Sequence, residues 1–109
     1  MRTLRFIVKG QIITQDPKCD FSGLVPGSEG YIQAEFVFSP EWDGCAKVAG
    51  FYSNLGIEYE PQILKDGSTC RIPAEALKRR IFKVQILGQK KDYIIRTNKL
   101  AVEQKGDKV

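Results

Sequence analysis

Apolar and polar residues alternate with a period of two along most of the chain, in short runs separated by Gly, Pro, Asn and Asp. Because successive side chains of a strand point to opposite faces, such runs predict β-strands that bury one face. In the clearest run, 31–39, Ile32, Ala34 and Phe36 share one side with Phe38. Strands are expected at 4–9 and, past a bulge at Gly10, at 11–14, then at 21–25, 31–39, 46–52, 57–64, 68–72, 81–87, 93–96 and 99–104.

The segments between the runs predict how the strands are connected. The turn 40–44 lies between the runs 31–39 and 46–52, so these two runs are expected to form a hairpin. Pro61 lacks the N–H that a ladder hydrogen bond needs, and the run 57–64 is therefore expected at a sheet edge.

One short helix is predicted, at 73–80. Pro73 suits the first turn, where its missing N–H has no partner to lose, and Glu75 lies near the positive end of the helix dipole. The three cations at 78–80 lie at the opposite end, which they stabilise. So short a segment forms one or two turns at most.

Many short strands and one short helix within 109 residues are typical of an immunoglobulin-like sandwich. We therefore predict an all-β protein, an immunoglobulin-like antiparallel β-sandwich, with a single domain over 1–104 and a frayed tail at 105–109. The composition, 42% apolar and 28% charged, agrees with a folded globular domain. The apolar run near the N-terminus is too short for a signal peptide or a membrane span, so neither is predicted.

The residue types that most catalytic and metal sites need are missing. With no histidine, serine and cysteine nucleophiles lack their usual base, and most zinc sites are excluded. Cys19, Cys45 and Cys70 are too far apart for a zinc knuckle, and an odd number without a secretion signal predicts reduced thiols. Glu58 and Glu60 share one side of a strand, where charge is expected to block pairing with another sheet. We predict no enzyme activity, no cofactor and no metal.

Positive charge is concentrated in the second half of the chain, which holds twelve of the seventeen Lys and Arg residues. The densest group is Lys78, Arg79, Arg80 and Lys83, which we predict to contact an acidic surface of a partner protein. Single-stranded nucleic acid would need aromatic faces beside these cations. Phe82 lies on the apolar side of its strand, so nucleic acid is not predicted as a partner.

Trp42 is the only tryptophan, and its position allows two interpretations. At the end of a strand it could contact a partner protein or a sugar, or it could close one end of the core. The second interpretation is the more typical of such a residue. Trp42 stays a candidate contact residue beside the basic group.

Six sequence pieces follow one another along the chain. They are LVPGS at 24–28, FVFSPEWDG at 36–44, KVAGF at 47–51, CRIPAE at 70–75, FKVQILG at 82–88 and TN at 97–98. In this order and spacing they resemble the small β-sandwich module of virion proteins of tailed phages of Gram-positive bacteria, notably upper baseplate and tail or head-fibre proteins. The resemblance extends from about residue 20 to residue 104, and each piece has the character of a scaffold element.

The resemblance implies a virion structural protein, assembled in the host cytoplasm, that docks onto other virion proteins, with self-association left open. The chain stops at Val109 without the coiled-coil or receptor-binding portion of longer relatives. Both a complete small protein and a piece of a longer fibre or baseplate protein therefore fit. Two other classes also stay open: a phage-encoded regulator or inhibitor of a host protein, and a carbohydrate-binding module that uses Trp42.

Overall fold

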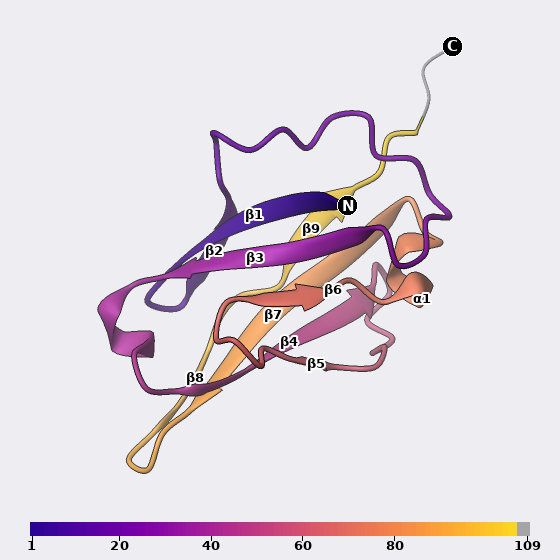
Figure 1. Ribbon diagram of the computed structural model, residues 1–109. Coiled ribbons are helices and arrows are strands. Elements are labelled where there is room, and N and C mark those ends of the chain that lie inside the picture. Colours follow the sequence, from indigo (N-terminus) through magenta and orange to yellow (C-terminus); the bar gives the residue numbers. More distant parts are fainter. Residues whose placement is uncertain (107–109) are drawn as a thin grey trace.

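Two β-sheets packed face to face form the computed structural model, which describes residues 1–106 (Figure 1). The first sheet has the strand order β2-β1-β3-β6, and the second has the order β5-β4-β7-β8, with β9 also paired to β7. The strands are β1 (Arg2–Lys9), β2 (Ile12–Gln15), β3 (Ile32–Phe38), β4 (Ala46–Ser53), β5 (Gln62–Ile63), β6 (Thr69–Arg71), β7 (Ile81–Gln89), β8 (Ile94–Arg96) and β9 (Leu100–Glu103). The prediction of an all-β sandwich is confirmed.

Strand β7 organises the second sheet. It pairs along its length with β4, and its other side is shared by β8 and β9. In the first sheet β1 and β3 run parallel, the one parallel pair among the strands of residues 1–106. This register sets Arg5 beside Glu35, with the guanidinium Nε 3.0 Å from the carboxylate.

The predicted hairpin of 31–39 with 46–52 is wrong, because β3 and β4 belong to different sheets. Between them the 3-10 helix η1 (Pro40–Trp42) carries the chain from the first sheet to the second, and Gly44 adopts a positive φ of 78°. Strand β3 pairs instead with β1 and β6. Alternation identifies the buried face of a strand but leaves its neighbour undetermined.

The N-terminal hairpin and the loop after it also differ from the prediction. Gly10 has a φ of 56° and reverses the chain, so β2 pairs antiparallel with β1 instead of continuing it past a bulge. The predicted strand at 21–25 is part of an irregular loop. The Arg2 guanidinium holds this loop by donating to the carbonyl oxygens of Asp20 and Ser22, at 2.9 and 2.6 Å.

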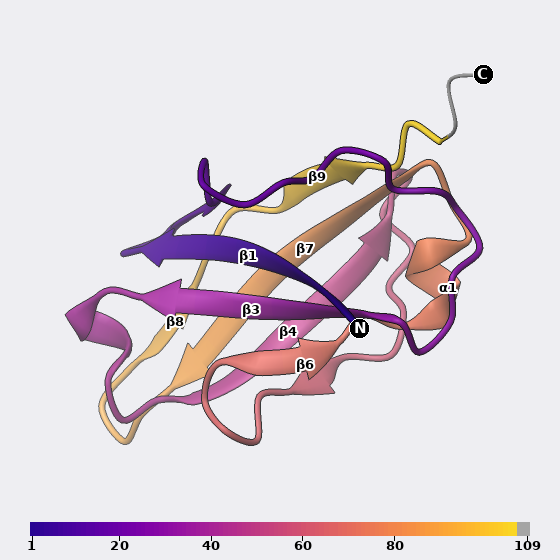
Figure 2. The ribbon, with the colours of Figure 1, turned by 45° about the horizontal axis from the view of Figure 1, so that its top comes forward.

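The edge strand and the helix are both shorter than predicted. Strand β5 lies at the edge of the second sheet, as Pro61 predicted, but it is only Gln62–Ile63, and Glu58 pairs with Tyr52 of β4 as an isolated bridge. The helix α1 is a single turn, Ala74–Leu77, because the chain must straighten before β7. Figure 2 shows α1 at one end of the sandwich beside the loop that precedes β3, where the Gly27 N–H donates to the carbonyl of Leu77 at 2.8 Å.

Apolar side chains from both sheets fill the space between them. The largest fully buried side chains include Trp42, Phe6, Phe36, Phe51 and Phe82. Trp42 packs on Phe38 with ring centroids 5.3 Å apart, and its indole N–H donates to the carbonyl of Gly10 at 2.8 Å. Trp42 therefore closes one end of the core. This is the second of the two interpretations of Trp42, and with its ring fully buried Trp42 presents no side-chain surface to a partner protein or a sugar in this structure.

The three cysteines carry free thiols, as predicted. Burial raises the pKa of the Cys70 thiol to about 12, and the charge of Asp66 adds to the shift. Because the thiolate is the reactive form, Cys70 is a packing residue at neutral pH.

The C-terminal end of the described chain is hydrogen-bonded to the loop that precedes β3. Of the predicted tail at 105–109, residues 107–109 lie outside the described residues, and the Gly106 N–H donates to the carbonyl of Leu24 at 2.9 Å. Within 1–106, no helix has the length and apolar character that crossing a membrane requires.

Candidate functional site

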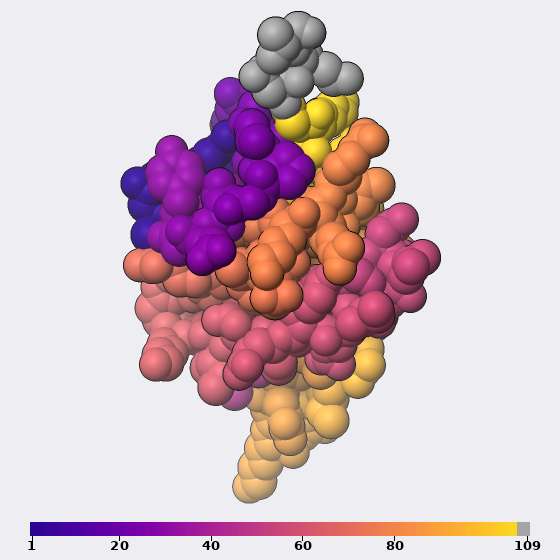
Figure 3. Space-filling model, turned by 90° about the vertical axis from the view of Figure 1, so that its right-hand side faces the viewer, coloured from indigo at the N-terminus to yellow at the C-terminus, as the bar shows by residue number. Residues whose placement is uncertain are grey.

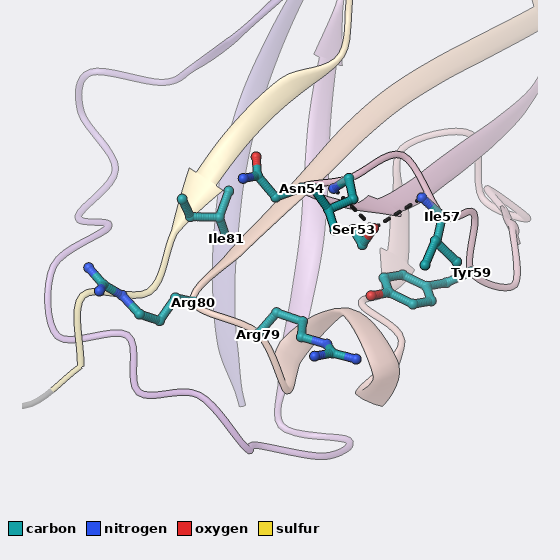
Figure 4. Close-up of a pocket in the computed structure, with 8 residues that line it drawn as sticks. Ser53, Asn54, Ile57, Tyr59, Arg79, Arg80 and Ile81 are labelled. Atoms are coloured by element: carbon teal, nitrogen blue, oxygen red, sulfur yellow. Dashed lines mark hydrogen bonds between the residues drawn. The ribbon is translucent and has the colours of Figure 1, made fainter.

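A hollow of about 400 Å³ lies at the end of the sandwich where the loop between β4 and β5 faces the turn between α1 and β7. It is lined by Ser53, Asn54, Leu55, Ile57, Tyr59, Arg79, Arg80 and Ile81 (Figure 4). Figure 3 shows this end in space-filling form, with the helix and turn in orange beside the β4–β5 loop in magenta. Two of the predicted contact residues, Arg79 and Arg80, therefore belong to one site.

Ser53 fixes the β4–β5 loop through both its side chain and its backbone. Its hydroxyl oxygen accepts hydrogen bonds from the N–H groups of Leu55 at 3.2 Å and Ile57 at 3.0 Å (Figure 4). Its own N–H donates to the carbonyl of Ile57 at 2.8 Å, and its carbonyl accepts from Gly56 at 3.0 Å. Gly56 has a φ of 94°, which favours glycine. The loop is therefore held in one conformation by its own hydrogen bonds.

This fixed loop presents two apolar side chains to solvent. Leu55 is 90% exposed, the highest value among the exposed large apolar residues of 1–106, and Ile57 is 63% exposed. Tyr59 follows them and packs against the core. Covering apolar surface that is held in water lowers the free energy, so burial of these two side chains would be favourable.

We expect Ser53→Ala to loosen this loop without unfolding the domain. The change removes one acceptor shared by two backbone N–H groups, which costs about 1 kcal/mol, and the loss falls mainly on the loop. Amide hydrogen exchange of Leu55 and Ile57 should accelerate about fivefold, while exchange in β7 stays unchanged. The neighbouring variant Asn54→Ala is the control. Equal exchange in all three proteins would show that the Ser53 hydroxyl does not order the loop.

The opposite wall of the hollow is held by Gln104, a fully buried residue just beyond β9. Its side-chain amide donates to the carbonyl oxygens of Leu77 at 2.9 Å and Arg79 at 2.7 Å. Its backbone N–H donates to the carbonyl of Arg80 at 2.6 Å. These three bonds hold the turn between α1 and β7, residues 78–80 and here called the arginine turn, against the end of β9. The two arginines are therefore presented from a fixed backbone.

The cations of this region differ in whether a carboxylate already neutralises them. Arg80 pairs with Glu103 at 3.2 Å, and Lys78 pairs with Glu75 at 3.3 Å. Arg79 is exposed, and within residues 1–106 no carboxylate lies within ion-pair distance of its guanidinium. In Figure 4 the side chains of Arg79 and Arg80 point in opposite directions, with Arg79 on the side of Tyr59. Arg79 is the cation that an incoming anion can use.

The structure separates the remaining members of the predicted basic group. Lys78 caps α1 and does not line the hollow. Lys83 lies on β7 opposite Tyr52 of β4 and Ala101 of β9, which places it on the outer face of the second sheet. The hollow thus brings together two of the five predicted contact residues, Arg79 and Arg80.

The apolar half of the site was not predicted from the sequence. Leu55 and Ile57 lie in a segment that predicted only a turn, Ser-Asn-Leu-Gly, followed by an edge strand. A large apolar residue inside a glycine-containing turn was the available signal, because such a side chain has no strand face to bury it. Its place opposite Arg79 follows from the tertiary fold alone.

Comparison of the chain with protein-family models, with curated proteins and with solved structures found no match. Among residues 1–106, no group of three or more His, Cys, Asp or Glu side chains is arranged to hold a metal ion. The hollow, with its fixed loop and its arginine, is the candidate functional site.

Proposed function

We propose that this protein is a non-catalytic structural protein of a phage virion, and that it docks onto other virion proteins of the baseplate, tail or head fibre. The observation that carries the docking role is the presentation of Leu55 and Ile57 on a loop fixed by Ser53. A surface that is already ordered loses little conformational entropy on binding, which favours a stable contact. The six sequence pieces that resemble phage sandwich modules support the virion assignment.

The buried polar residues support a structural role for the second sheet. The Tyr52 hydroxyl donates to the side-chain oxygen of Gln85 at 3.1 Å, and the Gln85 amide donates to the carbonyl of Thr97 at 2.7 Å. The Thr97 hydroxyl oxygen accepts from the N–H of Ile86 at 3.1 Å. These groups join β4, β7 and the segment between β8 and β9. Their hydrogen-bonding capacity is used within the fold, which fits a scaffold better than a reactive centre.

Mass spectrometry of purified virions from the source culture tests this proposal. We expect the protein to copurify with the particles through a density gradient and a high-salt wash, at a copy number that matches the symmetry of one substructure. Its synthesis should begin late in infection, together with the capsid proteins. Early synthesis with recovery in a complex with a host protein would support a regulator or inhibitor instead. Absence from washed virions would overturn the structural assignment.

A further inference from the structure

The residues that line the hollow indicate what kind of partner segment it can hold. The inference that follows rests on the proposed docking function. We infer that the hollow binds a segment of a partner protein in which a carboxylate side chain lies next to an aliphatic side chain. The carboxylate pairs with Arg79, and the aliphatic side chain packs between Leu55 and Ile57.

The charge of the segment follows from the ion pairs. The carboxylates of Glu75 and Glu103 are already taken by Lys78 and Arg80. Arg79 therefore offers a planar guanidinium fork to solvent, and that fork matches the two oxygens of a carboxylate.

The apolar lining decides between a protein and a nucleic acid. Leu55, Ile57 and Ile81 line the hollow, and Tyr59 is its one aromatic residue. Single-stranded nucleic acids bind chiefly by stacking bases on aromatic faces along a basic groove. Tyr59 packs against the core, and a single ring offers no such succession of faces. The branched side chains of Leu55, Ile57 and Ile81 can instead pack against an aliphatic side chain of a peptide.

The size of the hollow limits the segment. About 400 Å³ lies near the lower end of the range for ligand pockets, so it receives a few side chains and not a flat domain face. Both walls are fixed, one by Ser53 and the other by Gln104. A short extended segment can therefore enter without a rearrangement of the hollow.

An NMR titration of the isotope-labelled protein tests this inference. The probe is a blocked tetrapeptide, Glu-Leu-Glu-Leu, and the control peptide is Gln-Leu-Gln-Leu. We expect amide shifts confined to residues 53–59 and 79–81 and at least about fivefold weaker binding of the control peptide. Equal binding of the two peptides, or shifts elsewhere only, would refute the carboxylate contact. Tighter binding of a thymidine tetranucleotide at the same residues would assign the hollow to nucleic acid.

Matched variants locate the two contacts. Arg79→Ala should weaken peptide binding about fivefold, and Leu55→Ala about tenfold. Lys78→Ala, which removes a neighbouring cation outside the hollow, should leave the affinity unchanged. Ile94→Ala is the control for Leu55, because Ile94 is 64% exposed and lies on β8, where it pairs with Gln89 at the far end of β7. Equal losses in the control variants would refute a specific site.

Virion attachment separates this inference from the proposed function. If wild-type protein attaches to virions and the double variant Leu55→Ala, Arg79→Ala attaches equally well, docking stands and the hollow is not the contact. If peptide binding follows the pattern above but wild-type protein is absent from virions, the hollow stands and the virion assignment fails.

Discussion

Replacing Trp42 with alanine is expected to lower the free energy of unfolding by about 3–5 kcal/mol, a large part of what a small domain has. The ring is fully buried, packs on Phe38 and hydrogen-bonds the carbonyl of Gly10. Removing it leaves a cavity at the end of the core and an unpaired carbonyl. Urea unfolding followed by circular dichroism measures the loss, since the variant has no tryptophan fluorescence.

Gly88 supplies a control that depends on the same ring. A Cβ at Gly88 would lie 2.6 Å from the Trp42 ring, so Gly88→Ala alone should cost about 1–3 kcal/mol by overpacking. In the Trp42→Ala background the clash with the ring is gone and Ile95 Cγ2, at 3.1 Å, is the nearest remaining atom to the added Cβ, so the second change should cost much less. The two changes are therefore expected to be strongly non-additive. Additive costs, or an unchanged urea midpoint for Trp42→Ala, would contradict the packing of the ring against Gly88.

The fold class was predictable from sequence because alternation reports burial directly. The face shared by Ile32, Ala34 and Phe36 is buried as predicted, and Pro61 correctly placed its strand at an edge. The partner of each strand was not predictable. The hairpin expected across Pro40–Trp42 failed because that turn crosses between sheets, and the same residues and spacing suit either connection.

The candidate site was predictable only in its charge. A run of cations is visible in any sequence, so Arg79 and Arg80 were identified. That Arg80 is neutralised by Glu103, twenty-three residues later, depends on the pairing of β7 with β9. The contribution of Leu55 likewise depends on which loop faces the arginine turn. Long-range topology decides both, and the local pattern carries no information about it.

Gln104 connects the end of β9 to the turn that presents Arg79 and Arg80. Gln104→Glu replaces a buried amide donor by a carboxylate that faces the carbonyl oxygens of Leu77 and Arg79. At neutral pH we expect a loss of about 3 kcal/mol or more, because an unpaired charge is buried beside two acceptors. Urea unfolding at pH 8 measures it. The Arg79 and Arg80 amide signals should shift, since their turn keeps the backbone bond from residue 104 to Arg80 but loses the two side-chain bonds to Leu77 and Arg79.

The pH dependence of that variant distinguishes charge from packing. Burial raises the pKa of the introduced carboxyl in the folded protein above its value in the unfolded chain. The destabilisation is therefore full above the folded pKa and shrinks as the pH falls through it, because the protonated acid can donate to one carbonyl. Gln104→Met removes the donor without adding charge, so its cost should be the same at pH 8 and pH 5. A pH-independent cost for Gln104→Glu would mean that water reaches the side chain, and that the last strand does not hold the arginine turn as rigidly as the hollow requires.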